Sequence, residues 1–180
     1  CRNVPAAHQS MMEGRWDRKK FNGTELAGKT IGIVGAGRIG GAVAKRAQAF
    51  EMKVLVFDPI LTKLKAEALG VELVSIDELI ERSDFITIHA PKSEKTNNLI
   101  RAEHFAKMKP NCRIVNCARG GIVNEQDLAN ALRENKIAGA ALDVYTSEPL
   151  ESNPFLGLDN IVTTPHLAAS TDEAQLTVSV

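Results

Sequence analysis

Arg119, Glu148 and His166 each follow an apolar, strand-like run in the second half of the chain. Histidine titrates near neutral pH and therefore suits a general base that takes a proton from a hydroxyl group. A neighbouring carboxylate such as that of Glu148 would favour the imidazolium and fix the tautomer of the ring. Arginine offers a planar fork for a carboxylate or a keto oxygen, and its charge does not titrate away. Together the three residues predict hydride transfer between a nicotinamide and a 2-hydroxy or 2-keto acid.

Other titratable residues have competing interpretations. A lone histidine is more often structural than catalytic, and we interpret His8, His89 and His104 in that way. Asp143 ends the small-residue run 138–142, where its carboxylate could accept a hydrogen bond from a nicotinamide carboxamide. It could equally well cap a neighbouring helix, and the sequence does not decide between these two roles.

A glycine-rich turn, Gly35-Ala36-Gly37-Arg38-Ile39-Gly40, joins a buried-strand pattern to a helical pattern. In a dinucleotide site the first glycine allows a tight turn and the second lets the backbone approach a pyrophosphate. The third, Gly40, lets the helix pack closely on the strand. The pyrophosphate would then lie on free N–H groups at the positive end of the helix dipole.

The next strand-like run, 53–57, ends in Asp58. An acidic group at that point can accept hydrogen bonds from the ribose hydroxyls of the adenosine and would repel a 2′-phosphate. Pro59 and Ile60 supply no cation to neutralise such a phosphate. The pattern predicts a binding site for NAD and not for NADP. We prefer this interpretation to the alternative that these residues form only a structural turn.

These residues need a scaffold, and the chain from Lys29 onward alternates between short apolar runs and amphipathic segments. The expected strands are 30–35, 53–57, 71–74, 84–89, 112–117, 138–144 and 160–164. The expected helices are 38–50, 62–69, 76–82, 101–108 and 124–135. This alternation predicts an α/β fold, a doubly wound parallel sheet of the Rossmann type with about seven strands and helices on both faces. Ligands of such sheets bind beyond the carboxyl ends of the strands, where the residues above are expected.

Composition limits the class of protein. The 180 residues carry 22 basic and 22 acidic side chains, which argues against nucleic acid or an anionic membrane as the main partner. No apolar run approaches the ~20 residues that span a bilayer. Cys1, Cys112 and Cys117 form neither a metal-binding spacing nor an even disulfide set, so we expect no metal and a reducing cytoplasm.

Both ends look cut, because the chain opens at Cys1 without Met and stops inside a helical pattern capped by Ser170 or Thr171. We expect a leader helix and loop at 1–28, the dinucleotide-binding domain at 29–166 and the start of a truncated helix at 167–180. Trp16 lies among charged residues in the leader and suits either a core or an interface.

Several motifs resemble the NAD-dependent D-isomer-specific 2-hydroxyacid dehydrogenases over essentially the whole chain. They are Gly35–Gly40, Asn116–Glu125, Gly139–Val144, Ser147–Pro149 and Pro165–Leu167. The resemblance implies Arg119, Glu148 and His166 as catalytic residues, with His166 as the acid/base paired to Glu148. It implies NAD contacts at the glycine turn, Gly35, Gly37, Arg38, Ile39 and Gly40, and at Asp58, Ala90, Cys117, Ala118, Arg119, Asp143, His166, Ala168 and Ala169.

The resemblance also implies a substrate half-domain that this chain lacks, and a homodimer or higher homo-oligomer formed through the leader. The leader 14–26 and the tail 166–171 resemble members of the family that act on 3-phosphoglycerate, and this resemblance implies that substrate, oxidised to 3-phosphohydroxypyruvate on the route to serine. Lactate, glycerate and hydroxypyruvate remain alternative substrates. An NAD(H)-sensing module of the corepressor kind is the alternative from another class, since a fold does not fix a function.

Overall fold

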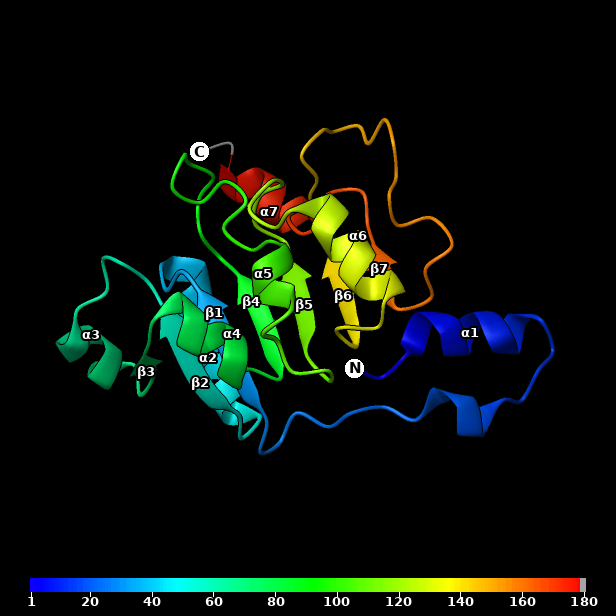
Figure 1. The fold of residues 1–180 in the computed structure, drawn as a ribbon, viewed down its shortest axis with the longest axis horizontal. Coiled ribbons are helices and arrows are strands. Elements are labelled where there is room, and N and C mark those ends of the chain that lie inside the picture. Colours follow the sequence, from blue (N-terminus) through cyan, green and yellow to red (C-terminus); the bar gives the residue numbers. More distant parts are fainter. Residues whose placement is uncertain (179–180) are drawn as a thin grey trace.

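The computed structural model describes residues 1–178, and its centre is a parallel sheet of seven strands in the order β3-β2-β1-β4-β5-β6-β7 (Figure 1). The strands are β1 (Thr30–Val34), β2 (Lys53–Phe57), β3 (Glu72–Leu73), β4 (Phe85–Ile88), β5 (Arg113–Asn116), β6 (Gly139–Leu142) and β7 (Ile161–Thr163). Because β1 lies between β2 and β4, the strand order reverses there, which is where ligands bind in such sheets.

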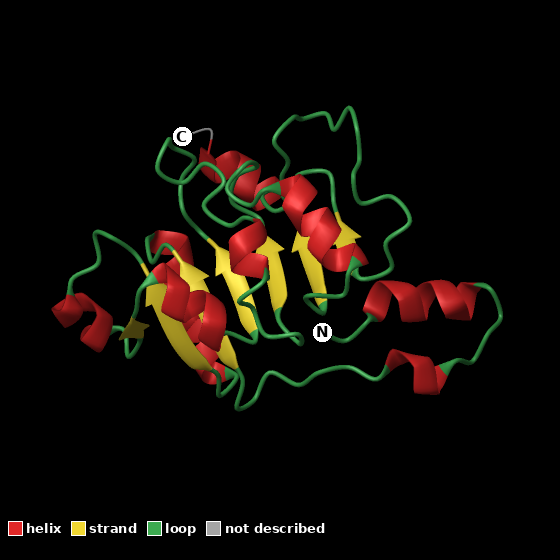
Figure 2. Ribbon diagram, in the orientation of Figure 1, coloured by secondary structure: helices red, strands yellow, loops and turns green. Residues whose placement is uncertain are grey.

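Helices connect the strands and cover both faces of the sheet (Figure 2). They are α2 (Arg38–Ala49), α3 (Lys63–Ala68), α4 (Ile76–Arg82), α5 (Ala102–Phe105) and α6 (Glu125–Arg133). Successive residues of β1 point to opposite faces: Ile33 packs in the apolar cluster that includes α2, and Val34 packs in the larger cluster with α4, α5 and α6. The sheet is therefore doubly wound, as the alternating pattern predicts.

The seven strands of the sheet and the helices α2 to α6 lie where the sequence predicts them; β2 and α4 have the predicted bounds, and the others are shorter by one to a few residues. The largest difference is α5, which was expected over 101–108 and ends at Phe105. The N–H groups of Lys107 and Met108 both bond to the His104 carbonyl, so the chain tightens into a turn. Pro110 then prevents further helix, because its ring lacks an N–H and restricts the residue before it.

The leader lies to the side of the sheet as an arm of α1 (Val4–Met12) and the short 3-10 helix η1 (Arg18–Phe21) (Figure 1). Its base is closed by a hydrogen bond from the Thr24 N–H to the Cys1 carbonyl, 2.9 Å long. At the other end, α7 (Asp172–Val178) begins at the expected cap, since Thr171 Oγ1 accepts from the Ala174 N–H. Among the described residues, no helix has the length and apolar character needed to cross a membrane.

Candidate active site

The glycine turn between β1 and α2 has the shape that close approach requires. Gly35 has φ +91°, and a Cβ there would lie 2.8 Å from the His89 carbonyl oxygen. A Cβ on Gly40 would lie only 2.0 Å from the Gly35 carbonyl oxygen, so the first turn of α2 packs directly on the loop. At Gly37 a Cβ would meet no protein atom within 4 Å. The helix N-terminus is therefore open on the side where a pyrophosphate would lie, and it carries the free N–H groups that such an anion needs.

Asp58 ties the end of β2 to this turn. Its Oδ2 accepts from the Ala36 N–H at 2.8 Å, and its Oδ1 accepts from the Ile60 and Leu61 N–H groups at 2.8 and 3.3 Å. A carboxylate offers about four lone-pair positions, so one on Oδ2 remains for a ribose hydroxyl. The residue predicted to read the ribose thus also holds the glycine turn in place.

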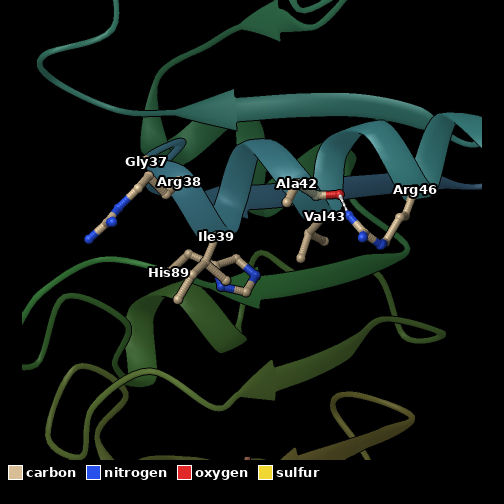
Figure 3. A pocket seen from close by; sticks show the side chains of 7 residues that line it. All are labelled: Gly37, Arg38, Ile39, Ala42, Val43, Arg46 and His89. Carbon is tan, nitrogen blue, oxygen red and sulfur yellow. Dashed lines mark hydrogen bonds between the residues drawn. The ribbon is translucent and has the colours of Figure 1, made fainter. Parts of the chain in front are cut away.

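A groove of about 620 Å³ runs from the N-terminus of α2 along its exposed side (Figure 3). Ile39 and His89 line it, and the Arg46 side chain folds back to bond the Ala42 carbonyl at 2.9 Å. The end of the groove at Gly37, Ile39 and His89 lies at the carboxyl edge of the sheet, and the rest follows α2 toward Arg46. His89 is bonded to Thr87 Oγ1 at 3.0 Å, and burial lowers its pKa, which fits the structural role predicted for it.

Arg119 lies on a turn after β5 that is braced by a buried amide. The Asn116 side chain accepts from the Ala118 N–H and donates to the Arg119 carbonyl, both at 3.0 Å. The next residue, Gly120, passes directly against another segment: a Cβ there would lie 1.8 Å from the Tyr145 carbonyl oxygen. Only glycine allows this approach, which brings the turn of Arg119 against the segment that leads to Glu148.

Two hydrogen-bonding groups fix the segment after β6. Glu148 Oε1 accepts from the Tyr145 N–H at 2.8 Å. The Glu125 carboxylate, at the start of α6, accepts from both the N–H and the hydroxyl of Thr146, at 2.6 and 2.7 Å. The Tyr145 hydroxyl donates to the Thr164 carbonyl at 3.0 Å, which connects this segment to the one that carries His166. No local pattern in the sequence indicates the roles of Glu125, Tyr145 or Thr146, because these side-chain contacts join residues 19 or 21 positions apart.

His166 lies beside Glu148, with its Nδ1 2.7 Å from Glu148 Oε2. The hydrogen bond with the His166 ring and then the one from the Tyr145 N–H lower the pKa of Glu148. The side chains of His166 and Glu148 are 48% and 36% exposed, so a small molecule can reach the pair. His166 has φ +55°, an uncommon conformation for a residue with a side chain.

Asp143 holds that conformation. Its Oδ1 accepts from the Thr164 hydroxyl at 2.5 Å and the Leu167 N–H at 2.7 Å, and its Oδ2 accepts from the Ala168 N–H at 2.8 Å. Burial opposes ionisation of this side chain, but the three hydrogen bonds outweigh it and lower the pKa of Asp143. Of the two predicted roles of Asp143, the structure shows a structural one, but its carboxylate holds the loop after β7 and does not cap a helix. One lone pair of Oδ2 remains for a carboxamide.

The structure brings Arg119, Glu148 and His166 to the wall of one hollow of about 260 Å³. Lys92, from the loop after β4, lines the same hollow and was not predicted. The other expected cofactor contacts follow strand ends at the same edge of the sheet: Ala90 after β4, Cys117 and Ala118 after β5, and Ala168 and Ala169 after β7. His104 is buried and its Nδ1 accepts from the Arg101 N–H, whereas His8 lies exposed on α1, so neither belongs to the site.

Residues 1–168 match the family model described as the NAD-binding domain of D-isomer-specific 2-hydroxyacid dehydrogenases. The chain belongs to this family. NAD is therefore the cofactor of the domain, in agreement with the prediction from Asp58 and the glycine turn. A crystal structure of the NAD-dependent formate dehydrogenase from Staphylococcus aureus in complex with NAD has the same fold, with a TM-score of 0.88 and 37% identity over 98% of this chain and 54% of that one.

Other members of the 2-hydroxyacid dehydrogenase family are also similar. D-3-phosphoglycerate dehydrogenase of Methanocaldococcus jannaschii is 54% identical over 176 residues, which are 97% of this chain and 34% of that protein. The apo-structure of D-lactate dehydrogenase from Escherichia coli has a TM-score of 0.90 and 32% identity, over 99% of this chain and 56% of that one. The chain thus spans about a third of the length of the curated relatives it matches.

Proposed function

We propose that the full-length protein transfers a hydride between NAD and a D-2-hydroxy acid, and that 3-phosphoglycerate is its substrate, oxidised to 3-phosphohydroxypyruvate. The observation that carries this proposal is the 2.7 Å contact between Glu148 Oε2 and His166 Nδ1, on the wall that Arg119 shares. Base, orienting carboxylate and anion-binding fork are the groups that oxidation of a 2-hydroxy acid needs.

His166 acts as the acid/base in this proposal. Because Nδ1 faces Glu148, the ring presents Nε2 to a substrate hydroxyl, and the carboxylate keeps the proton of the neutral ring on Nδ1. Nε2 takes the hydroxyl proton as the alcohol carbon is oxidised, and the ionised Glu148 stabilises the resulting imidazolium. In the reverse direction the imidazolium returns that proton to the keto oxygen.

Arg119 orients the substrate. Its guanidinium is exposed, and its Nη1 bonds the neighbouring Ala118 carbonyl at 2.6 Å, which leaves further N–H groups for a carboxylate. NAD, when bound, supplies the hydride acceptor. Gly37, Arg38 and Ile39 would hold its pyrophosphate, Asp58 its ribose, and Ala90, Cys117, Ala118, Asp143, Ala168 and Ala169 would line its path along the carboxyl edge.

The preference for a phosphorylated acid rests on the similarity to relatives that carry the name D-3-phosphoglycerate dehydrogenase over nearly the whole chain. Lactate, glycerate and hydroxypyruvate are the alternatives, since a relative of the same fold is a D-lactate dehydrogenase. The test is a panel of D- and L-2-hydroxy acids offered to the full-length protein with NAD, read as NADH absorbance. We expect oxidation of D-3-phosphoglycerate above the other acids. NADH formation from L-acids only, or from none of the panel, would contradict the proposal.

We also propose that the chain divides into a leader (1–28), an NAD-binding domain (29–166) and the start of a helix (167–180, described to 178), and that the leader joins copies of a cytoplasmic enzyme into a homodimer or higher homo-oligomer. Trp16, Met12 and Val4 of the leader are 79%, 70% and 65% exposed, which is a large apolar area for a solvated arm. We expect this arm to pack on a second copy. Sedimentation of the full-length Trp16→Ala variant should show a weaker dimer, and an unchanged dimer would rule the arm out.

A further inference from the structure

Lys92 lies on the loop after β4, and the residues on both sides of it are fixed. The Thr96 hydroxyl donates to the Pro91 carbonyl at 2.7 Å, and the Ser93 N–H donates to Thr96 Oγ1 at 2.8 Å. Further along, the Asn98 N–H donates to the Gly121 carbonyl at 2.7 Å. The loop that carries Lys92 is therefore fastened to the turn that carries Arg119.

The Lys92 ammonium reaches that turn as well. Gly121 has φ +78°, and a Cβ on it would lie 3.3 Å from Lys92 Nζ and 3.5 Å from Asn97 Oδ1. The absence of a side chain at Gly121 lets the lysine lie across the turn, where it lines the same hollow as Arg119, Glu148 and His166.

The charges around this hollow do not balance. Glu148 is already bonded to His166, and within residues 1–178 no carboxylate forms an ion pair with Lys92 or Arg119. The wall thus carries two basic side chains, Lys92 and Arg119, and one carboxylate, Glu148. The 2-carboxylate of a simple hydroxy acid supplies a single negative charge, which is enough for Arg119 alone.

We propose that Lys92 binds a second anionic group of the substrate, separate from the 2-carboxylate, and thereby selects phosphorylated 2-hydroxy acids. The proposal rests on the dehydrogenase function proposed above and names a residue of this chain for its substrate choice. A phosphate ester carries roughly −1.5 to −2 charges at neutral pH and three strong acceptor oxygens, which suits a lysine ammonium. Lactate or hydroxypyruvate has no such group for Lys92 to bind.

The test compares two keto acids that differ only in the phosphate, 3-phosphohydroxypyruvate and hydroxypyruvate. The full-length protein and its Lys92→Gln, Lys92→Arg and Lys95→Gln variants are assayed for kcat/KM with NADH, and their NADH affinity is measured by calorimetry. Lys95 is the matched control, an exposed lysine of the same loop that does not line the hollow.

We expect Lys92→Gln to lower kcat/KM for 3-phosphohydroxypyruvate by about tenfold to a hundredfold, the size of a hydrogen bond to a charged group. In this variant, hydroxypyruvate kinetics and NADH affinity should stay as in the wild type. Lys92→Arg keeps the positive charge and should retain most of the wild-type kcat/KM for 3-phosphohydroxypyruvate. Lys95→Gln should behave as the wild type. An equal loss for both keto acids, a loss of NADH affinity, or no change would each overturn the proposal. A wild type that reduces neither acid would instead refute the dehydrogenase function on which it rests.

Discussion

At the scale of single residues, the acidic side chains of the site each do two things. Asp58 and Asp143 use most of their lone pairs to hold backbone turns, and keep one for a ligand. Glu148 bonds its own segment through the Tyr145 N–H and bonds His166 with its other oxygen. A substitution at any of them therefore changes both the geometry of a turn and the chemistry beside it.

Asp58 gives the first prediction, on cofactor choice. Replacing it with Ser together with Ile60→Arg removes the repulsion of a 2′-phosphate and adds a cation beside it, so NADP should gain affinity and NAD should lose it. Calorimetry with both cofactors measures the ratio of the two affinities. Asp58→Asn is the matched control, since it keeps a side-chain carbonyl for the glycine turn. Unchanged relative affinities in the double variant would show that Asp58 does not contact the ribose.

Glu148 gives a prediction on pH dependence. The hydrogen bond with the His166 ring lowers the pKa of Glu148, so the carboxylate keeps its charge to lower pH than an ordinary glutamate and can stabilise an imidazolium beside it. Glu148→Gln removes the negative charge beside the ring, and without that charge a protonated imidazole is less favourable relative to a neutral one. The acidic limb of the pH–rate profile for hydroxy-acid oxidation should therefore move to lower pH. A limb that keeps its position would exclude the pairing from the reaction.

At the scale of elements, two turns at the carboxyl edge touch through their backbones. Gly120→Ala should place a methyl group where the Tyr145 carbonyl lies, and so separate the turn of Arg119 from the segment of Glu148. We expect a loss of about 1–3 kcal/mol in the free energy of unfolding, the usual cost of overpacking, together with lower turnover. Urea unfolding, monitored by circular dichroism, measures the change in the free energy of unfolding.

Gly41→Ala is the control for this substitution. A Cβ on Gly41 would meet only the Ala36 carbonyl oxygen, at 3.8 Å, and the residue lies inside α2. Alanine is the better helix former by roughly 0.5–1 kcal/mol, so this variant should be more stable than the wild type. If both variants were destabilised equally, the contact of Gly120 with Tyr145 would not be the cause.

Much of this element structure could be predicted from the sequence, for identifiable reasons. The buried residues of runs 30–35 and 53–57 are apolar, because both faces of the sheet are covered, and Ser75 with Glu78 forms a capping box that fixes the start of α4. The contacts between turns could not be predicted. Gly120 against Tyr145, Glu125 on Thr146 and Lys92 beside Gly121 each join segments that are distant along the chain. Such contacts depend on strand order, which local patterns do not encode.

At the scale of the whole molecule, cofactor binding and turnover should separate. The glycine turn, Asp58 and the sheet that positions them lie within residues 29–166, so residues 1–180 alone should bind NADH. Catalysis also needs a closed cleft that excludes water and fixes the acid against the nicotinamide. This chain spans about a third of its curated relatives, and we predict little or no turnover from it. Turnover by residues 1–180 near that of the full-length protein would refute the two-domain description of the cleft.

The acid/base role of His166 is best tested by the rate of one hydride transfer in the full-length protein with and without the imidazole. NADH-loaded wild type and His166→Ala are mixed with excess 3-phosphohydroxypyruvate in a stopped-flow instrument, and the loss of NADH absorbance is followed. This role predicts a rate lower by about 10²–10⁴ in the variant at saturating NADH, the usual size of a general acid–base contribution. Equal rates in the two proteins would contradict it.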